Sequence, residues 1–254
     1  MERWPAGVGR EIVDELDSTN AEALRRAAAG AFGPVWILAR RQTAGRGRRG
    51  RSWAMPEGNF AATLLARPAE APLALRSFVA ALGLHDAVTA VTGRPELFAL
   101  KWPNDVLLSG RKLAGILLEG APGGGLAIGI GVNLTVAPDP AALEPGAVPP
   151  VSLAEATGIR VAPEEFLDLL APALQDWEAR LLADGFAPVR TAWLARATRL
   201  GQEITARLPG RALTGRFETV DETGALVLST AEGRVVLPAA EIHFAAEVPH
   251  AARH

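Results

Sequence analysis

Residues 97–120, "LFALKWPNDVLLSGRKLAGILLEG", carry the pattern that decides the fold. Two apolar runs flank Ser109–Gly110–Arg111, and a short glycine-containing connection of this kind predicts an antiparallel hairpin. The first residues, 97–102, read as a separate strand. "GLAIGIGVNL" at 125–134 is a further apolar strand, and its glycines indicate close backbone approach. These runs together predict the central part of a β-sheet.

The rest of the chain supplies the partners of these strands. Further strands are expected at 10–16, 34–40 and 59–67, and helices at 73–92, 163–184 and 186–197. "DSTNAEALRRAAAG" (17–30) predicts a helix with a capping box at Thr19 and Glu22 and with Gly30 after its end. After Gly201 the chain changes to short strands separated by "PG", "DETG" and "AEG" turns.

Two units are therefore expected. Residues 1–198 form an α+β domain, with a mixed sheet flanked by helices, and residues 199–254 form a small β-barrel of about five strands with a C-terminal tail. The proline-rich segment 136–150 is expected to be an ordered or semi-rigid loop.

Composition restricts the class of protein. The 254 residues are 49% hydrophobic and 21% charged, as in an ordinary soluble globular protein. The chain has no cysteine, which excludes disulfides and thiolate metal sites and fits a cytoplasmic protein. Its start has no signal-peptide pattern. The longest apolar stretch, 73–92, is interrupted by Arg76, His85 and Asp86, so no membrane span is expected.

Positive charge is concentrated in "RRQTAGRGRRGR" (40–51), which contains six of the 26 basic residues. Without those six, 20 basic residues stand against 28 acidic ones, a balance of −8. A general nucleic-acid-binding protein usually spreads positive charge over a face. A local cluster instead suits one small anionic ligand.

The segment 40–51 also matches G-x-G-x-x-G, but its context differs from that of a dinucleotide loop. "RSWAMPEGNF" follows it, and Pro56 and Gly58 exclude the helix that such a loop must enter. Neither lysine follows a glycine, which excludes a Walker loop. Glycines allow a loop to close over a ligand, and arginines donate forked hydrogen bonds to carboxylate and phosphate. We therefore expect a mobile lid over an anionic ligand.

Rare residue types gather around the same segments. The chain has two lysines, Lys101 and Lys112, and four asparagines, Asn20, Asn59, Asn104 and Asn133. In a chain that otherwise uses arginine, a retained lysine indicates a place where a compact charge on a flexible stem is needed.

Three segments, "DSTN" (17–20), "QTAGRGRRGRSW" (42–53) and "KWPNDVLLSGRKLAGILLE" (101–119), resemble biotin–protein ligases in their order and spacing. The resemblance covers nearly the whole chain. It implies a class II synthetase-like catalytic domain related to lipoyl ligases and an SH3-like C-terminal barrel. Because "DSTN" begins at residue 17, the chain resembles the monofunctional group without an N-terminal DNA-binding domain.

The activity implied by this resemblance has two steps. Biotin and ATP, the latter with Mg²⁺, give biotinoyl-5′-AMP and pyrophosphate. A specific lysine of a biotin carboxyl carrier protein, from acetyl-CoA carboxylase or pyruvate carboxylase, then takes the biotinyl group. The expected partners include no DNA and no membrane, and a homodimer is possible.

The resemblance also implies roles for individual residues. The expected catalytic residues are Lys112, Arg48 and Asp105, of which Asp105 either binds Mg²⁺ through ATP or orients the acceptor lysine. Biotin contacts are expected from Ser18, Thr19, Asn20, Gln42, Gly45, Arg46, Gly47, Arg48, Lys112 and Gly115. Contacts to ATP or the adenylate are expected from Arg46, Arg51, Trp53, Lys101, Asn104, Gly131 and Asn133.

Some alternatives remain open at this stage. Arg40, Arg41 and Arg49 are either functional or simply solvated. Gly129 and Gly131 are expected to let backbone groups approach the ligand. The final strand, "EIHFAAEV", has Ala245 near a point where some relatives use an arginine, so no nucleotide contact is expected there. The rival functions are a lipoyl or octanoyl ligase, a biotin sensor and a nucleic-acid-binding module.

Overall fold

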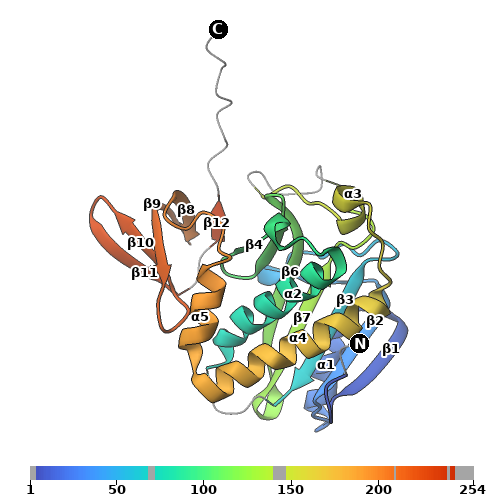
Figure 1. Ribbon diagram of the computed structural model, residues 1–254. Helices are drawn as coiled ribbons and strands as arrows, with labels where there is room; N and C mark the ends of the chain where they lie inside the picture. The colour runs from blue at the N-terminus through green and yellow to red at the C-terminus, as the bar shows by residue number, and fades with distance from the viewer. Residues whose placement is uncertain (1–3, 68–71, 140–146, 209, 239–240, 244–254) are drawn as a thin grey trace.

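The computed structural model describes residues 4–67, 72–139, 147–208, 210–238 and 241–243. Its centre is a seven-stranded sheet in the order β1-β2-β3-β7-β6-β5-β4 (Figure 1). Only the β1–β2 pair is parallel, and each later pair in the sheet is antiparallel, as a mixed sheet requires. The strands are β1 (Gly9–Leu16), β2 (Val35–Gln42), β3 (Phe60–Ala66), β4 (Phe98–Lys101), β5 (Asp105–Leu108), β6 (Arg111–Ala121) and β7 (Gly125–Val132).

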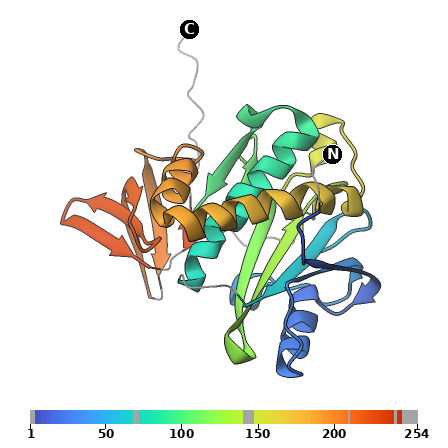
Figure 2. The ribbon, with the colours of Figure 1, turned by 60° about the horizontal axis from the view of Figure 1, so that its bottom comes forward.

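Helices cover both faces of this sheet. The face packed with the largest apolar cluster carries α2 (Arg76–Thr92) and α4 (Pro163–Asp184), and α5 (Phe186–Leu194) extends that layer. Helix α1 (Thr19–Ala28) packs on the opposite face with Ile37, Leu65 and Ala127. Figure 2 shows α1 on the other side of the strands from α2 and α4. Strand β3 is buried along nearly its whole length because helices lie over both of its sides.

The hairpin predicted at 105–120 is confirmed. Ser109 and Gly110 both have positive φ, of 48° and 77°, which is the conformation that a two-residue connection between strands needs. Helix α2 ends as expected at Gly93, whose φ is 68°. By length and composition Leu73–Thr92 could cross a bilayer, but 67% of it is buried inside the fold, as in a core helix.

Three local predictions need correction. The N-cap of α1 is Ser18 rather than Thr19, and its hydroxyl accepts from Ala21 N, so Thr19 and Glu22 form no capping box. Helix α5 ends at Leu194 instead of 197, because Leu100 N donates to Arg196 O and ties the chain to β4. A short helix, α3 (Leu153–Thr157), was not predicted, although Ser152 and Glu155 form its capping box.

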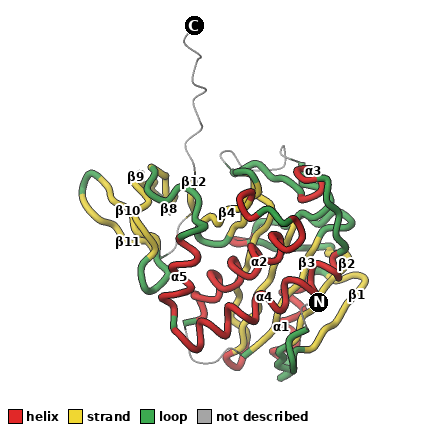
Figure 3. Tube along the Cα trace, viewed as in Figure 1, coloured by secondary structure: helices red, strands yellow, loops and turns green. Residues whose placement is uncertain are grey.

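The second unit is a five-stranded antiparallel sheet in the order β11-β10-β9-β8-β12, which stands to one side in Figure 3. Its strands are β8 (Glu203–Leu208), β9 (Arg211–Val220), β10 (Leu226–Thr230), β11 (Gly233–Leu237) and β12 (Glu241–His243). Over the described residues β11 and β12 do not pair with each other, so the SH3-like barrel is open. The sheet contacts the first unit where Trp102 Nε1 donates to Gly224 O at 3.1 Å.

Candidate active site

A cavity of about 490 Å³ lies on the sheet face that carries α1. Its wall combines the start of α1, the arginine-rich segment, the β4–β5 turn and the facing residues of β6 and β7. Every predicted site residue except Gly45 lines it: Ser18, Thr19, Asn20, Gln42, Arg46, Gly47, Arg48, Arg51, Trp53, Lys101, Asn104, Asp105, Lys112, Gly115, Gly131 and Asn133. Segments that are far apart in sequence therefore meet in one place, as the three motifs predicted.

The part of the cavity around Thr19 and Gln42 is polar and uncharged. Thr19 donates to Gln42 Oε1 from its backbone N at 2.8 Å and from its hydroxyl at 3.2 Å. The hydroxyl of Thr63, fully buried on β3, lies 2.8 Å from that of Thr19 and donates to Asn20 Oδ1 at 2.6 Å. Hydroxyls and amides of this kind offer both donors and acceptors to a neutral polar ligand. Sequence reasoning missed Thr63, whose only signal is a hydroxyl within an apolar strand.

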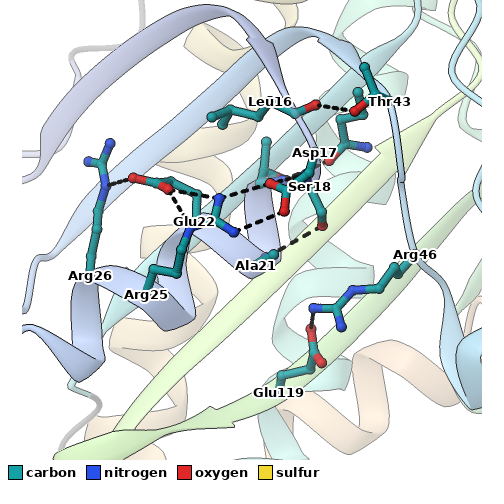
Figure 4. A network of polar contacts seen from close by, with 12 residues as sticks. Leu16, Asp17, Ser18, Ala21, Glu22, Arg25, Arg26, Thr43, Arg46 and Glu119 are labelled. Atoms are coloured by element: carbon teal, nitrogen blue, oxygen red, sulfur yellow. Dashed lines mark hydrogen bonds and ion pairs between the residues drawn. The ribbon is translucent and has the colours of Figure 1, made fainter.

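An ion-paired cluster outside the cavity supports this end (Figure 4). Arg25 donates to both oxygens of Asp17, at 2.9 and 2.8 Å, and this pairing lowers the pKa of Asp17 to about 2. Asp17 Oδ1 also accepts from Ser18 N at 2.7 Å. Two backbone hydrogen bonds, Thr43 N to Leu16 O and Ala44 N to Asp17 O, join the end of β2 to the same turn. The arginine-rich segment therefore starts from a fixed point beside Ser18.

The opposite end of the cavity is cationic. Lys112 Nζ lies 2.7 Å from Asp105 Oδ1, and Lys101 Nζ lies 3.8 Å from Asp105 Oδ2. Burial acts to raise the pKa of Asp105, but the charges of Lys112 and Lys101 outweigh it and hold that pKa below its usual value. The carboxylate is therefore ionised and fixes both ammonium groups in place.

A β-bulge gives Lys112 its direction. The pairing of β5 with β6 shifts between Val106 and Leu107, which leaves Leu113 as an extra residue on β6. Bulges turn the side chains next to them, and Leu113 is fully buried while Lys112 lines the cavity. The backbone of Lys112 is also fixed, since its N donates to Pro149 O and its O accepts from Val151 N.

The arginine-rich segment closes on itself over the cavity. Arg46 pairs with Ser52, Gly47 N donates to Arg51 O at 2.7 Å, and Trp53 N donates to Gly45 O at 2.8 Å. A short 3-10 turn, Arg48–Gly50, is followed by β3, so the prediction that no α-helix follows this loop is confirmed. A Cβ on Gly45 would meet Trp53 O at 2.6 Å, so this glycine serves the loop itself.

The six arginines of the segment do not act alike. Arg40 pairs with Glu164 and Asp14, and Arg41 pairs with Glu15, all on exposed surface. Neither lines the cavity, whereas Arg46, Arg48, Arg49 and Arg51 do. Arg48 Nη1 donates to Asn104 Oδ1 at 3.3 Å, and Asn104 Nδ2 donates to Ile116 O at 2.7 Å.

Two glycines of β7 make room for side chains. A Cβ on Gly131 would lie 2.5 Å from Trp53 Nε1, and a Cβ on Gly129 would lie 2.8 Å from Asn20 Cγ. We expected these glycines to admit a ligand, but here Trp53 and Asn20 occupy that space. Trp53 also lies near the cationic end, because Lys112 Nζ is 5.9 Å from the centre of its ring.

Three buried polar atoms at the cavity have no hydrogen-bond partner within the described part of the chain: Trp53 Nε1, Asn133 Oδ1 and Asp105 Oδ1. Asp105 Oδ1 is ion-paired with Lys112 Nζ at 2.7 Å, which leaves Trp53 Nε1 and Asn133 Oδ1. The amide nitrogen of Asn133 is used internally, since it donates to Val151 O at 3.2 Å and to Lys112 O at 3.5 Å. Buried polar atoms are seldom left unpaired, so one donor and one acceptor here are available to a ligand.

Sequence reasoning missed several wall residues. Pro138, Ala147, Val148 and Pro150 come from the proline-rich segment, of which 140–146 lies outside the described residues. Ile242 comes from β12 of the second sheet. Only pairing between distant segments places these residues here, and their residue types give no such signal. Ala245, where no nucleotide contact is expected, also lies outside the described residues.

Known proteins resemble this chain in sequence and in fold. The Biotin/lipoate A/B protein ligase family matches residues 15–135, and the Biotin protein ligase C terminal domain matches residues 200–244. A Paracoccus denitrificans protein named biotin–[acetyl-CoA-carboxylase] ligase is 57% identical over 92% of this chain and 99% of its own length. A Mycobacterium tuberculosis protein of the same name is 33% identical over 91% of this chain and 87% of its own length.

A solved structure shows the same similarity in fold. The Aquifex aeolicus biotin protein ligase in complex with biotin and ATP superposes with a TM-score of 0.79 at 26% identity, covering 92% of this chain and 97% of that one.

Proposed function

The chain belongs to the biotin protein ligase family, and on this premise we propose that it activates biotin with ATP and transfers it to a protein lysine. The observation that carries the proposal is the two-ended cavity. Its uncharged end, around Thr19 and Gln42, suits the neutral urea ring of biotin, and its cationic end, around Lys112 and Arg48, suits a carboxylate meeting a phosphate. One bound molecule of biotinoyl-5′-AMP has both kinds of group.

In the first step a biotin carboxylate oxygen attacks the α-phosphorus of ATP, and pyrophosphate leaves. Two anionic groups must approach each other, so fixed positive charge lowers the barrier. Lys112 provides this charge, because Asp105 holds its ammonium group at 2.7 Å. Arg48 provides a second charge from the loop above, beside Asn104. Removing one such group typically costs about 10²–10³ in rate.

In the second step the neutral amine of a carrier lysine attacks the acyl carbon, an amide bond forms, AMP leaves with the bonding electron pair and the amine nitrogen loses one proton to solvent. The loop over the cavity keeps water from hydrolysing the mixed anhydride in the meantime. Asp105 was expected either to bind Mg²⁺ through ATP or to orient the acceptor lysine. Its pairing with Lys101 and Lys112 supports a different role, in which it keeps their ammonium groups directed at the reacting carboxyl and phosphate.

The described residues do not offer Mg²⁺ a site of their own. They contain no group of three or more His, Cys, Asp or Glu side chains, and the Asp105 carboxylate is already paired with two ammonium groups. Mg²⁺ usually binds through substrate phosphates with one or two carboxylates. We therefore infer that it enters with ATP, and we assign no step to a metal held by Asp105.

The unpaired atoms support a nucleotide at the cationic end. Asn133 Oδ1 can accept a hydrogen bond from an exocyclic amine, and Trp53 Nε1 can donate one. The Trp53 indole, beside Gly131, also offers an aromatic face for stacking. Trp53 and Asn133 were both expected to contact ATP or the adenylate. The unpaired atoms add which of the two residues donates the hydrogen bond and which accepts it.

The decisive experiment is incubation with biotin, MgATP and a biotin carboxyl carrier domain, followed by mass measurement of the carrier and a pyrophosphate assay. We expect one biotinyl addition per carrier domain. Parallel reactions with lipoate and octanoate test the alternative ligase of the same fold. Pyrophosphate release with lipoate but not biotin would reverse the assignment, and biotin binding with no release of pyrophosphate would indicate a sensor.

Three finer points belong to the proposal. We place the reaction in the cytoplasm, where ATP is available and where a cysteine-free chain fits well. We expect no DNA binding, because four of the clustered arginines line the cavity. The carrier is expected to belong to acetyl-CoA carboxylase or pyruvate carboxylase, and a homodimer remains a prediction for ultracentrifugation.

A further inference from the structure

Glu119 lies on β6 at the end of the site remote from the reacting groups. Lys112 Nζ lies beside Gly115, 3.7 Å from the position that a Cβ on that residue would take. Glu119 follows Gly115 by four residues on the same strand, roughly 13 Å at 3.3 Å per residue. The alternation along β6 places Gly115, Leu117 and Glu119 on the same face of the sheet. Glu119 therefore marks the end of that face opposite Lys112.

Two groups from different segments meet the Glu119 carboxylate. Asn20 Nδ2 donates to Oε2 at 2.8 Å, and Arg46 Nη2 lies 3.6 Å from the same oxygen. Figure 4 shows the Arg46 side chain directed away from its own loop towards Glu119. The carboxylate thus joins the start of α1 to the arginine-rich loop through a single atom.

The Asn20 amide is fixed by this arrangement. One amide nitrogen carries two hydrogens, and Asn20 Nδ2 has two acceptors, Glu119 Oε2 and Leu117 O at 3.4 Å. Asn20 Oδ1 accepts from Thr63 at 2.6 Å, and the side chain packs on the bare backbone of Gly129. Without Glu119 the Asn20 amide nitrogen would lose its charged acceptor. The orientation of the Asn20 amide would then no longer be set by a carboxylate.

The loop arginines consequently serve different ends of the cavity. Arg48 reaches Asn104, next to Asp105 and the lysines. Arg46 reaches Glu119, on the side of Asn20. Arg46 was expected to contact both biotin and the adenylate, and its place beside Glu119 favours the biotin contact.

We propose that Glu119 is a positioning residue for the biotin-ring end, acting through Arg46 and Asn20, and that Arg46 retains biotin while Arg48 serves the adenylation chemistry. This proposal rests on the proposed function, because it takes biotin as the ligand of the uncharged end. Its distinguishing consequence is selective. Loss of Glu119 weakens biotin binding and leaves ATP binding nearly unchanged.

The test is a double-mutant cycle on biotin affinity, measured by calorimetry with the full chain. Glu119→Gln keeps an amide oxygen for Asn20 but removes the charge facing Arg46. We expect it to raise the Kd for biotin about three- to fivefold, the range of a partly exposed ion pair. Arg46→Gln should have a similar effect, and the double variant should be no weaker than either single one, because both remove the same contact. Glu119→Ala, which also removes the acceptor for Asn20, should cost about tenfold or more.

Glu218→Gln is the matched control. It removes a comparable ion pair, Glu218 to Arg234 at 3.4 Å, from the second sheet. This variant should bind biotin like the wild type, and the KM for ATP should stay within about twofold for Glu119→Gln, as expected for loss of a contact to one substrate only. Independent, additive effects of Glu119→Gln and Arg46→Gln on biotin affinity would overturn the inference, as would an equal rise in the KM for ATP.

Failure of the two proposals can be told apart. A wild type that binds biotin but never labels the carrier overturns the proposed ligase function alone, since the cycle on biotin affinity still decides the role of Glu119. A wild type that labels the carrier, together with an additive cycle, overturns the role of Glu119 alone. A wild type that does not bind biotin overturns both.

Discussion

Gly131→Ala tests whether the close packing of Trp53 on β7 shapes the site. The new methyl carbon would stand 2.5 Å from Trp53 Nε1, well inside van der Waals contact, so the indole must move. Overpacking of this kind costs about 1–3 kcal/mol. At about 2–4 °C per kcal/mol for a chain of this size, the melting temperature should fall by several degrees. The KM for ATP should rise, since the aromatic face offered to the nucleotide is displaced.

Gly120→Ala on the neighbouring strand is the matched control. No atom lies within 4 Å of the Cβ position there, so the substitution adds only the preference of a strand for alanine over glycine, about 0.5–1 kcal/mol in favour of folding. The two alanines should thus shift stability in opposite directions.

The assay is thermal and urea unfolding of both variants, followed by Gly131→Ala combined with Trp53→Ala. If the indole is the obstacle, Gly131→Ala should cost much less stability in a Trp53→Ala background than it does in the wild type. The reasoning would be refuted if Gly131→Ala unfolded like Gly120→Ala, or if its cost were the same with and without the indole.

Three further predictions concern the cationic end. Lys112→Arg should lower pyrophosphate release by about 10²-fold or more, because the larger fork cannot take the place of an ammonium held 2.7 Å from Asp105; near-normal release would contradict this. Arg48→Gly should let adenylate escape and biotinylate an unrelated protein. Arg41→Gly, which removes an exposed ion pair with Glu15, should not. Equal stray labelling by both variants would count against the role of Arg48. Lys112 and Lys101 lower the pKa of Asp105, so its ion pairs stabilise the fold at pH values above the pKa of the unfolded state, about 3.9. This stabilisation is lost as the pH falls through the lower pKa of the folded state. Urea unfolding should show the stability difference between wild type and Asp105→Asn shrinking below about pH 4, and a growing difference would exclude the pairing.

The sequence was enough to predict those elements whose ends depend on residues close together in the chain. The hairpin at Ser109–Gly110 and the end of α2 at Gly93 depend on backbone conformations that favour glycine, and sequence shows them directly. The N-cap of α1 was placed one residue late, because Ser18 and Thr19 are both good caps. What separates them is that Thr19 is bonded to Gln42, a contact visible only in three dimensions.

The membership of the site was predictable, but the direction of its side chains was not. The motif segments contain most residues of the wall, but not those of the proline-rich segment or Ile242. They could not show that Arg46 turns to Glu119, because the two are 73 positions apart and meet only through the sheet. The same limit hid Thr63, whose hydroxyl matters only because β3 lies beneath α1. The β-bulge at Leu113 leaves no sequence mark, yet it directs Lys112 into the cavity.

The presence of Ile242 in the wall has a consequence for biosynthesis. The cavity joins Ser18, made early on the ribosome, to a residue translated 224 positions later. At about 5–20 residues per second, the two are separated by roughly 10–45 seconds of translation. The nascent chain therefore holds most of the catalytic residues well before it can enclose a reactive anhydride. The wall of the cavity is therefore complete only once the second sheet is in place.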